Sequence, residues 1–246
     1  MAFDDGPFLE IDDGEFNALD FKLTASTIPE LFEDSEDQHI SSRSYWARVL
    51  PYRESMLRSV EQLVKDGEVY KFEERFRAML YQVHALGAHQ GRVRAGGTKK
   101  RAPADKFLGD MAAAEDILMF GDKFIADIVN ERYLGDDGKL KAGAINHRAQ
   151  MYISKATRGT ANRSWVKESI RQNPRMKVDW DTTTLETGCE TCPIREANSP
   201  YLLATLTFWP GDCTTECFTN CQCILTREDG IQTFLPEPPA LGIYNG

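Results

Sequence analysis

The stretch from residue 68 to residue 90, EVYKFEERFRAMLYQVHALGAHQ, decides the fold. Its large apolar residues recur at spacings of three and four, which places their side chains on one face of an α-helix. The pattern predicts a long amphipathic helix and favours a mainly α-helical protein. The residues on the apolar face are Val69, Phe72, Phe76, Met79, Leu80 and Val83.

The preceding stretch, residues 41–67, predicts a second helix. Serines at its start are suited to cap a helix, and Gly67 is suited to end one. Pro51 lies within the stretch and predicts that the helix is kinked or divided in two. The apolar residues expected to face the core are Trp46, Val49, Leu50, Leu57, Val60, Leu63 and Val64.

Residues 91–105, GRVRAGGTKKRAPAD, hold three glycines, one proline and five bases, and they predict a basic loop. Helical spacing returns over residues 106–133 and again over residues 142–172, where a break is expected near Gly159. We therefore predict a body of four to five helices over residues 41–175, closed by Pro174. Its later core residues are expected to be Phe107, Leu108, Met111, Ile117, Leu118, Phe124, Ile125, Ile128, Val129, Ile145, Tyr152, Ile153, Trp165, Val166 and Ile170.

The net charge of −9 belongs to the start of the chain. Residues 1–37 hold twelve acids and one base, Lys22, which leaves 26 acids and 28 bases for the rest. Residues 1–40 also hold more than ten large apolar residues without a helical or strand period. We interpret this segment as an extended acidic arm that orders against a partner surface. The alternative is a solvated tail, although such segments usually carry fewer apolar residues.

With 41% hydrophobic residues, the chain can bury a core without disulfides. No run approaches the roughly 18 apolar residues that a membrane-spanning helix needs. The N-terminus has neither a basic start nor a hydrophobic signal core. We therefore expect no membrane association and synthesis in the cytoplasm.

All six cysteines lie between residues 189 and 223, so we place a domain boundary near residue 175 and a cysteine-rich module at residues 176–246. Their spacing is C-x2-C, twenty residues, then C-x3-C-x3-C-x-C. Short-spaced cysteines in a reducing compartment are the usual way to present thiolates to a tetrahedral zinc ion. The alternative is a set of free or paired cysteines without metal. The cysteines are Cys189, Cys192, Cys213, Cys217, Cys221 and Cys223.

The predicted site is structural rather than catalytic. A catalytic zinc keeps an open position and is generally bound by histidine or carboxylate, whereas all four histidines lie outside the module. Zinc should supply much of the folding free energy of a segment so poor in apolar residues. The chain also lacks the phosphate-binding loop, zinc-protease, hydrolase and dinucleotide motifs. We therefore expect a non-enzymatic protein with one structural zinc ion per chain.

Several short motifs surround the cysteines. They are Trp180-Asp-Thr, Glu186, Cys189 with Cys192, Phe208-Trp-Pro-Gly-Asp212, Thr215-Glu-Cys217 and Asn220-Cys-Gln-Cys223. Together these motifs resemble the C-terminal module of minor head (head-morphogenesis) proteins of tailed bacteriophages. The resemblance covers about 50 residues of the module and extends loosely to residues 41–172. The chain departs from the family where Gln222 replaces an arginine and Cys213 replaces a glycine.

The resemblance implies a minor structural protein of the virion that assists head assembly near the portal and the packaged genome. Its partners would be the portal or the major capsid protein, and it would lie in the host cytoplasm during assembly. Related sequences place a histidine near Cys217, which implies that Cys217 is a ligand and Cys213 is not. The candidate ligands are then Cys189, Cys192, Cys217, Cys221 and Cys223, of which four bind the zinc ion.

A second function class stays open, namely a zinc-dependent nucleic-acid-binding regulatory protein. Zinc knuckles often serve nucleic acids, and the basic loop offers cations to phosphates. Its lack of interleaved aromatic residues favours a solvated loop or weak, non-specific DNA contact. The residues for such contact are Arg92, Arg94, Lys99, Lys100 and Arg101.

Overall fold

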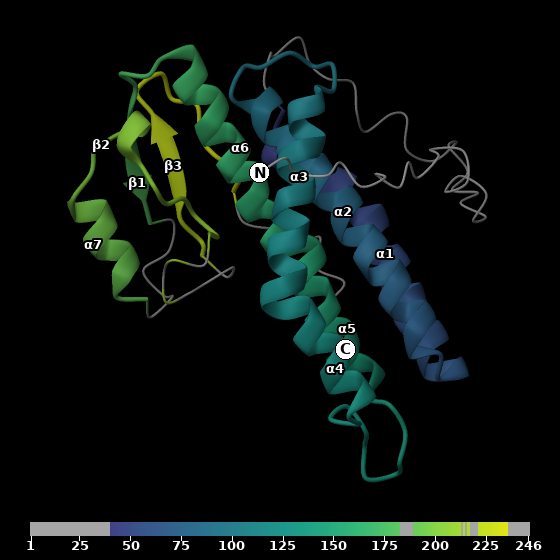
Figure 1. Ribbon diagram of the computed structural model, residues 1–246. Coiled ribbons are helices and arrows are strands. Elements are labelled where there is room, and N and C mark those ends of the chain that lie inside the picture. Colours follow the sequence, from purple (N-terminus) through teal and green to yellow (C-terminus); the bar gives the residue numbers. More distant parts are fainter. Residues whose placement is uncertain (1–39, 183–188, 213, 215, 217–220, 236–246) are drawn as a thin grey trace, which may run out of the picture. The chain divides into compact units, whose positions relative to one another are not determined.

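The computed structural model describes residues 40–182, 189–212, 214, 216 and 221–235. Residues 1–39 of the predicted acidic arm, Cys213 and Cys217 lie outside these residues, whereas Ile40 is described and buried in the helical core. The described chain is mainly helical, as predicted, with a small antiparallel sheet near its C-terminal end (Figure 1).

Helix α1 (Ser42–Asp66) begins and ends where the sequence indicates. The side chain of Ser41 accepts a hydrogen bond from the Ser44 amide at 3.1 Å, which caps the first turn. Gly67 has a φ of 69°, a left-handed conformation that favours glycine and ends the helix. The helix runs through Pro51 instead of dividing there.

Helix α2 (Val69–Arg94) is the central element of the helical body and packs against α1, α3 and α6. Its predicted apolar face is buried except at Val69, which is half-buried. The predicted start of the basic loop is wrong, because α2 continues through Gly91 to Arg94 and the loop begins only at Ala95. Gly91 allows α2 to approach the helix that carries Ala161 closely, since a Cβ atom at this position would lie 1.9 Å from the carbonyl oxygen of Ala161.

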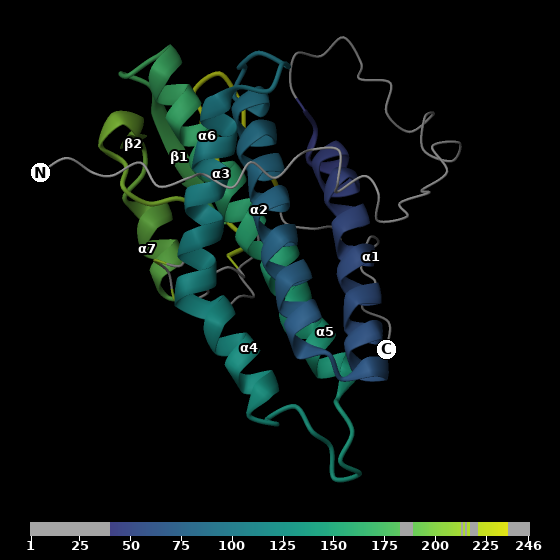
Figure 2. The same cartoon turned by 45° about the vertical axis from the view of Figure 1, so that its right-hand side comes forward.

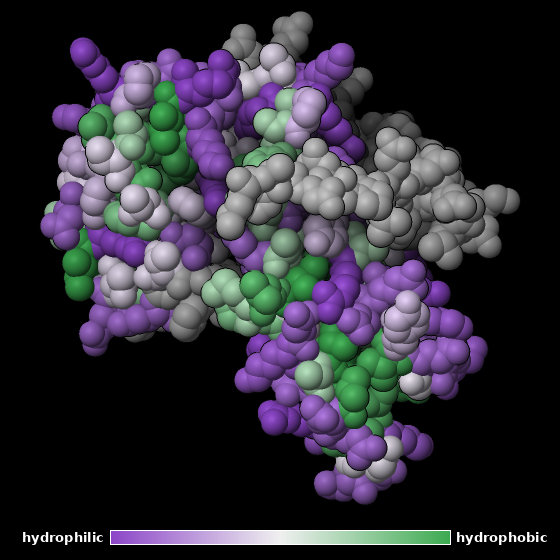
Figure 3. Space-filling model, in the orientation of Figure 1, coloured by the Kyte–Doolittle hydropathy of each residue, from purple (hydrophilic) through white to green (hydrophobic). Residues whose placement is uncertain are grey.

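The predicted helix at residues 106–133 is present as α3 (Pro103–Asp116), a π-helical turn η3 (Ile117–Gly121) and α4 (Asp122–Val129). Several residues predicted for its core face are exposed instead, Phe107 by 68%, Leu118 by 78% and Val129 by 60%. A π-helical turn holds an extra residue and rotates the side chains that follow it. A single period of 3.6 therefore misassigns Leu118 and Val129, which lie within and after the turn. Phe107 precedes the turn, so its exposure has a different origin. Figure 3 shows apolar, green patches on the part of the helical body where α4 lies in Figure 1.

The predicted helix at residues 142–172 is likewise divided by a π-helical turn. It consists of α5 (Ala142–Gln150), η4 (Met151–Ala156) and α6 (Thr157–Gln172). The expected break at Gly159 is wrong, because Gly159 lies inside α6. A Cβ atom at Gly159 would lie 2.4 Å from the carbonyl oxygen of Gly211, so this glycine allows contact between two segments of backbone.

The sheet has the strand order β2-β1-β3, with both pairings antiparallel. The middle strand β1 (Lys177–Asp181) pairs with β2 (Tyr201–Leu202) and with β3 (Ile224–Arg227). Burial alternates along the middle strand, so that one face of the sheet packs inward. Helix α7 (Thr191–Ala197) lies between β1 and β2 in the sequence, and the 3-10 turn η6 (Leu203–Thr205) follows β2.

The cysteine-rich segment is built onto α6, as both Figure 1 and Figure 2 show. Trp165 of α6 lies in a core with Trp180 and Leu225 of the sheet. Phe234, which follows β3, returns to the helical core and stacks on Tyr45 with ring centroids 4.3 Å apart. The chain changes from helix to strand near residue 175, and the segments on both sides belong to one compact unit.

Candidate metal centre

Four of the six cysteines are described, and all four are buried. Cys189 precedes α7, Cys192 lies in its first turn, and Cys221 and Cys223 lie directly before β3. The sheet places β3 beside β1, while α7 contacts β1. Two segments that are far apart in the sequence are thereby brought together at one buried point.

The sulfur atoms are spaced as a metal site requires. The Sγ atoms of Cys192, Cys221 and Cys223 all lie within 4.8 Å of one another. Cys192 Sγ lies 3.9 Å from Cys221 Sγ and 3.4 Å from Cys189 Sγ. Tetrahedral zinc with Zn–S distances of about 2.3 Å separates its sulfur ligands by about 3.8 Å. The same distances are too long for a disulfide, whose sulfurs are about 2 Å apart.

The electrostatics of the cluster also fit a metal ion. The pKa of the Cys223 thiol is raised well above its usual range, first by its hydrogen bond with Cys221 and then by burial. A reactive cysteine needs a lowered pKa, so this thiol is a poor nucleophile. A divalent cation reverses the preference, because thiolate is the form that coordinates. The cluster therefore suits metal binding better than covalent catalysis.

The FWPGD motif forms a tight turn beside the cysteines. Gly211 has a φ of 85°, a conformation that favours glycine. The carboxylate of Asp212 accepts hydrogen bonds from the amides of Trp209 and Thr214, both at 2.9 Å. Asp212 is therefore used to close the turn.

An arginine on α7 fixes that helix against the aromatic residues of the module. The guanidinium of Arg195 lies 4.1 Å from the ring centroid of Phe208 and 5.0 Å from that of Trp180. It also donates a hydrogen bond to Thr214 Oγ1 at 2.9 Å. These contacts support the helix that carries Cys192.

Among the predicted ligands the structure brings together Cys192, Cys221 and Cys223. The sulfur of Cys189 lies beside that of Cys192 but outside this group of three. Cys217, the fifth candidate, lies outside the described residues. Sequence reasoning missed Arg158, whose side chain donates to the backbone carbonyls of Cys221 and Cys223. A lone arginine in a helix carries no signal of such a role, since its contacts are 63 and 65 residues away.

The basic residues of the predicted loop fall into two groups. One group forms hydrogen bonds inside the protein, and the other is exposed. Arg92 donates to Asp105 at 2.6 and 2.8 Å and also to backbone carbonyls of the loop. Arg94 donates to the carbonyls of Ile40 and Gln232, and burial lowers its pKa to about 10. Both therefore stabilise the fold. The exposed bases of the loop are Lys99, Lys100 and Arg101.

The two histidines of α2 are buried and hydrogen-bonded. His84 Nδ1 lies 2.7 Å from Thr160 Oγ1, and its Nε2 lies 3.1 Å from Asp116 Oδ2. This order resembles a nucleophile triad, but the hydroxyl belongs to a buried threonine that a substrate cannot reach. His89 contacts Asp105 at 3.2 Å, and burial lowers its pKa. Both are core histidines held by neighbouring side chains, although the contact of His84 Nε2 with Asp116 does not have hydrogen-bond geometry.

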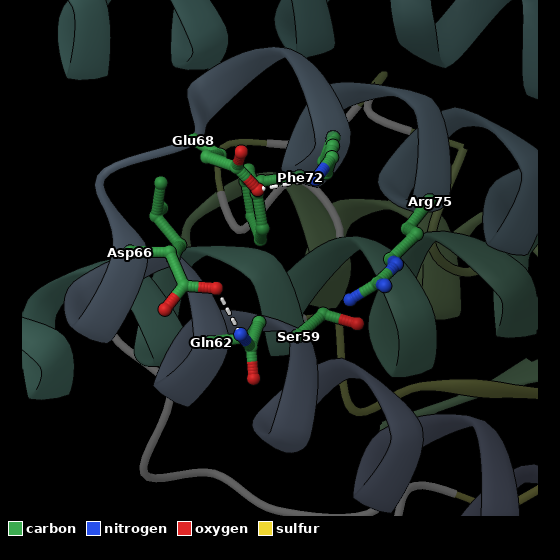
Figure 4. A pocket seen from close by; sticks show the side chains of 8 residues that line it. Ser59, Gln62, Asp66, Glu68, Phe72 and Arg75 are labelled. Carbon is green, nitrogen blue, oxygen red and sulfur yellow. Dashed lines mark hydrogen bonds and ion pairs between the residues drawn. The ribbon is translucent and has the colours of Figure 1, made fainter.

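A pocket lies where α1 ends and α2 begins (Figure 4). Its polar lining is engaged internally, with Gln62 bonded to Asp66 and Lys71 paired with Glu68 at 2.7 Å. The described cysteines lie elsewhere, so this pocket is not the candidate metal centre.

Comparison with protein-family models, with curated proteins and with solved structures finds no match for this chain. Among the described helices, none is long and apolar enough to cross a membrane.

Proposed function

We propose that the cysteine cluster holds one structural zinc ion. The observation that carries this proposal is the convergence of the buried thiols of Cys192, Cys221 and Cys223. The candidates for the fourth ligand are Cys217 and Cys189, whose sulfur lies 3.4 Å from that of Cys192 but outside the group of three. A bound ion would join α7 to the start of β3 and close the module.

A structural role follows from the donor set. The cluster offers buried sulfur alone, and the described histidines lie on α2 and α5. Structural zinc sites are closed by four protein ligands, whereas catalytic sites leave a position for water. The four described thiols are buried, which suits a closed structural site.

We propose further that the protein is a minor structural component of a tailed-phage head, not an enzyme. The support is the resemblance of the motifs around its cysteines to head-morphogenesis proteins, together with the order of a helical body followed by a cysteine-rich segment. The partners would be the portal or the major capsid protein. The protein would act near the packaged genome, and it would be found in the virion and in the host cytoplasm during assembly.

Two measurements test these proposals. Elemental analysis of the purified chain should find one zinc ion per molecule, and no metal in freshly reduced protein would exclude the zinc site. Co-expression with portal and major capsid proteins should give co-purification. Failure to associate with either, and absence from purified particles, would exclude the head-protein assignment.

The second candidate function is zinc-dependent nucleic-acid binding, with non-specific contact to phosphates. The observation that favours it is the exposure of Lys99, Lys100 and Arg101, none of which forms an ion pair with a described residue. DNA affinity that falls steeply with salt would support this function, because each neutralised phosphate releases counterions. Affinity for head proteins without such dependence would favour the first proposal.

A further inference from the structure

Arg158, in the first turn of α6, is 3% exposed and faces the candidate metal centre. Its guanidinium donates hydrogen bonds to the backbone carbonyl oxygens of Cys221 and Cys223, the latter at 2.7 Å. A third bond goes to the carbonyl of Phe234 at 2.9 Å. The side chain of Arg158 therefore holds the backbone at both Cys221 and Cys223, which are two of the candidate ligands.

The neighbours of Arg158 on α6 contact the same segment. A Cβ atom on Gly159 would lie 2.4 Å from the Gly211 carbonyl oxygen, so the two backbones are in direct contact. Asn162 donates to the carbonyl of Pro210 at 2.9 Å and accepts from the amide of Phe234 at 3.3 Å. We call Arg158, Gly159 and Asn162 the α6 seam.

Helix α6 packs along α2, and this packing supports the seam. A guanidinium on such a rigid element presents its planar set of donors in one orientation. The carbonyls of Cys221 and Cys223 then have a fixed partner, and their thiols are directed toward Cys192. Orientation of ligands by outer residues is a general feature of metal sites.

The charge of Arg158 complements that of a zinc–thiolate centre. Four thiolates and one zinc ion carry a net charge of about −2, and burying such a charge is costly unless it is compensated. The guanidinium keeps its positive charge at all ordinary pH values. Because Arg158 lies beside two candidate ligands, its positive charge would offset part of the negative charge of the zinc–thiolate centre.

We propose that Arg158 is a positioning residue of the metal centre, which orders the Cys221–Cys223 backbone and couples zinc binding to the order of α6. This inference rests on the proposed zinc site. Because coupling is reciprocal, zinc bound to the module stabilises the first turns of α6, and loss of the arginine weakens the binding of zinc.

The test is a zinc competition titration of the full chain with Arg158→Lys and Arg158→Met, using a chelator of known affinity. Arg158→Met should lose about 10–100-fold in zinc affinity, the range found for residues that support metal ligands. Arg158→Lys should lose less, because it keeps the charge but not the fork of donors. Cobalt substitution should show an altered ligand-field spectrum in both variants.

The matched controls are Arg53→Lys and Arg53→Met. Arg53 is 2% exposed, and its Nε donates to Gln150 Oε1 at 3.1 Å within the helical body. These changes should lower the melting temperature and leave zinc affinity and the cobalt spectrum unchanged. Wild-type affinity and spectrum in both Arg158 variants would overturn the inference.

Hydrogen exchange on the wild-type chain gives a second measurement that needs no folded variant. Removal of zinc should increase amide exchange in the first turns of α6, and unchanged exchange there would contradict the coupling. A wild-type chain that takes up no zinc would overturn the metal site itself. That outcome differs from one in which the wild type binds zinc but the Arg158 variants bind it with unchanged affinity, which would overturn only the role of Arg158.

Discussion

Cys192 and Cys221 carry the metal hypothesis at the scale of single residues. Their sulfurs lie 3.9 Å apart although 29 residues separate them in the sequence. Single changes of either cysteine to serine should abolish tight zinc binding, because three thiolates cannot close the site. We expect Cys189→Ser to be similarly severe and Cys213→Ser to be mild. Zinc content and melting temperature of each variant check this prediction.

The protonation of Cys223 gives a prediction with a definite sign. Its pKa is raised from the ordinary value of 9.0 in the metal-free fold, chiefly by the bond with Cys221 and by burial. The thiol therefore stays protonated in the folded state while the unfolded chain loses its proton above pH 9.0. Stability of the metal-free module should be fully present below that pH and should fall as pH rises further.

The zinc-bound protein should show the opposite trend, because protons compete with zinc for the thiolates. Zinc affinity should rise with pH across the neutral range. Urea unfolding over a series of pH values, with and without chelator, separates the two behaviours. Identical pH profiles in the two states would contradict a metal site that includes Cys223.

At the scale of elements, the packing of α2 against α6 depends on Gly91. A methyl group at this position would collide with the Ala161 carbonyl oxygen, at 1.9 Å. Gly91→Ala should therefore lower the free energy of unfolding by about 1–3 kcal/mol, which is the usual cost of overpacking. Gly143→Ala in α5 is the control, since a Cβ atom there would meet nothing within 4 Å. There the helix propensity of alanine should stabilise slightly. Urea unfolding of both variants measures the difference.

The connection between α2 and α3 depends on the buried pair of Arg92 and Asp105. Burial opposes the charge of Asp105, yet hydrogen bonds from Arg92 and from the Ala102 amide keep the pKa of this carboxyl lowered. Asp105→Asn should cost about 3–5 kcal/mol, because it leaves the arginine without its charge partner. Denaturant unfolding checks the magnitude, and Asp110→Asn on the exposed face of α3 is the control. An equal effect of both changes would show that the pair contributes little.

At the scale of the whole molecule, the sequence predicted the helices well because their apolar residues follow a regular period. The faces of residues 106–133 were less predictable, since the π-helical turn at Ile117–Gly121 changes the period without a composition signal. The cysteine spacing predicted the cluster, whereas the place of Arg158 depends on contacts with residues 63 and 65 positions away. Such contacts follow from tertiary packing, which local patterns do not encode.

The role of the exposed bases separates the two proposed functions of the molecule. Changing Lys99, Lys100 and Arg101 to glutamine should leave the fold intact, because these side chains are exposed and make no ion pair with a described residue. Each lost phosphate contact should reduce the logarithmic salt slope of DNA binding by about 0.9. Circular dichroism and DNA titration at several salt concentrations provide the measurements.

A head-assembly protein should still co-purify with portal or capsid protein after this change, since those contacts would involve other surfaces. A nucleic-acid regulator should lose its main activity. A triple variant that binds DNA as the wild type does, with the same salt slope, would show that the loop contacts no phosphates. A variant that loses DNA binding, in a protein that never associates with head proteins, would instead make nucleic-acid binding the function of this chain.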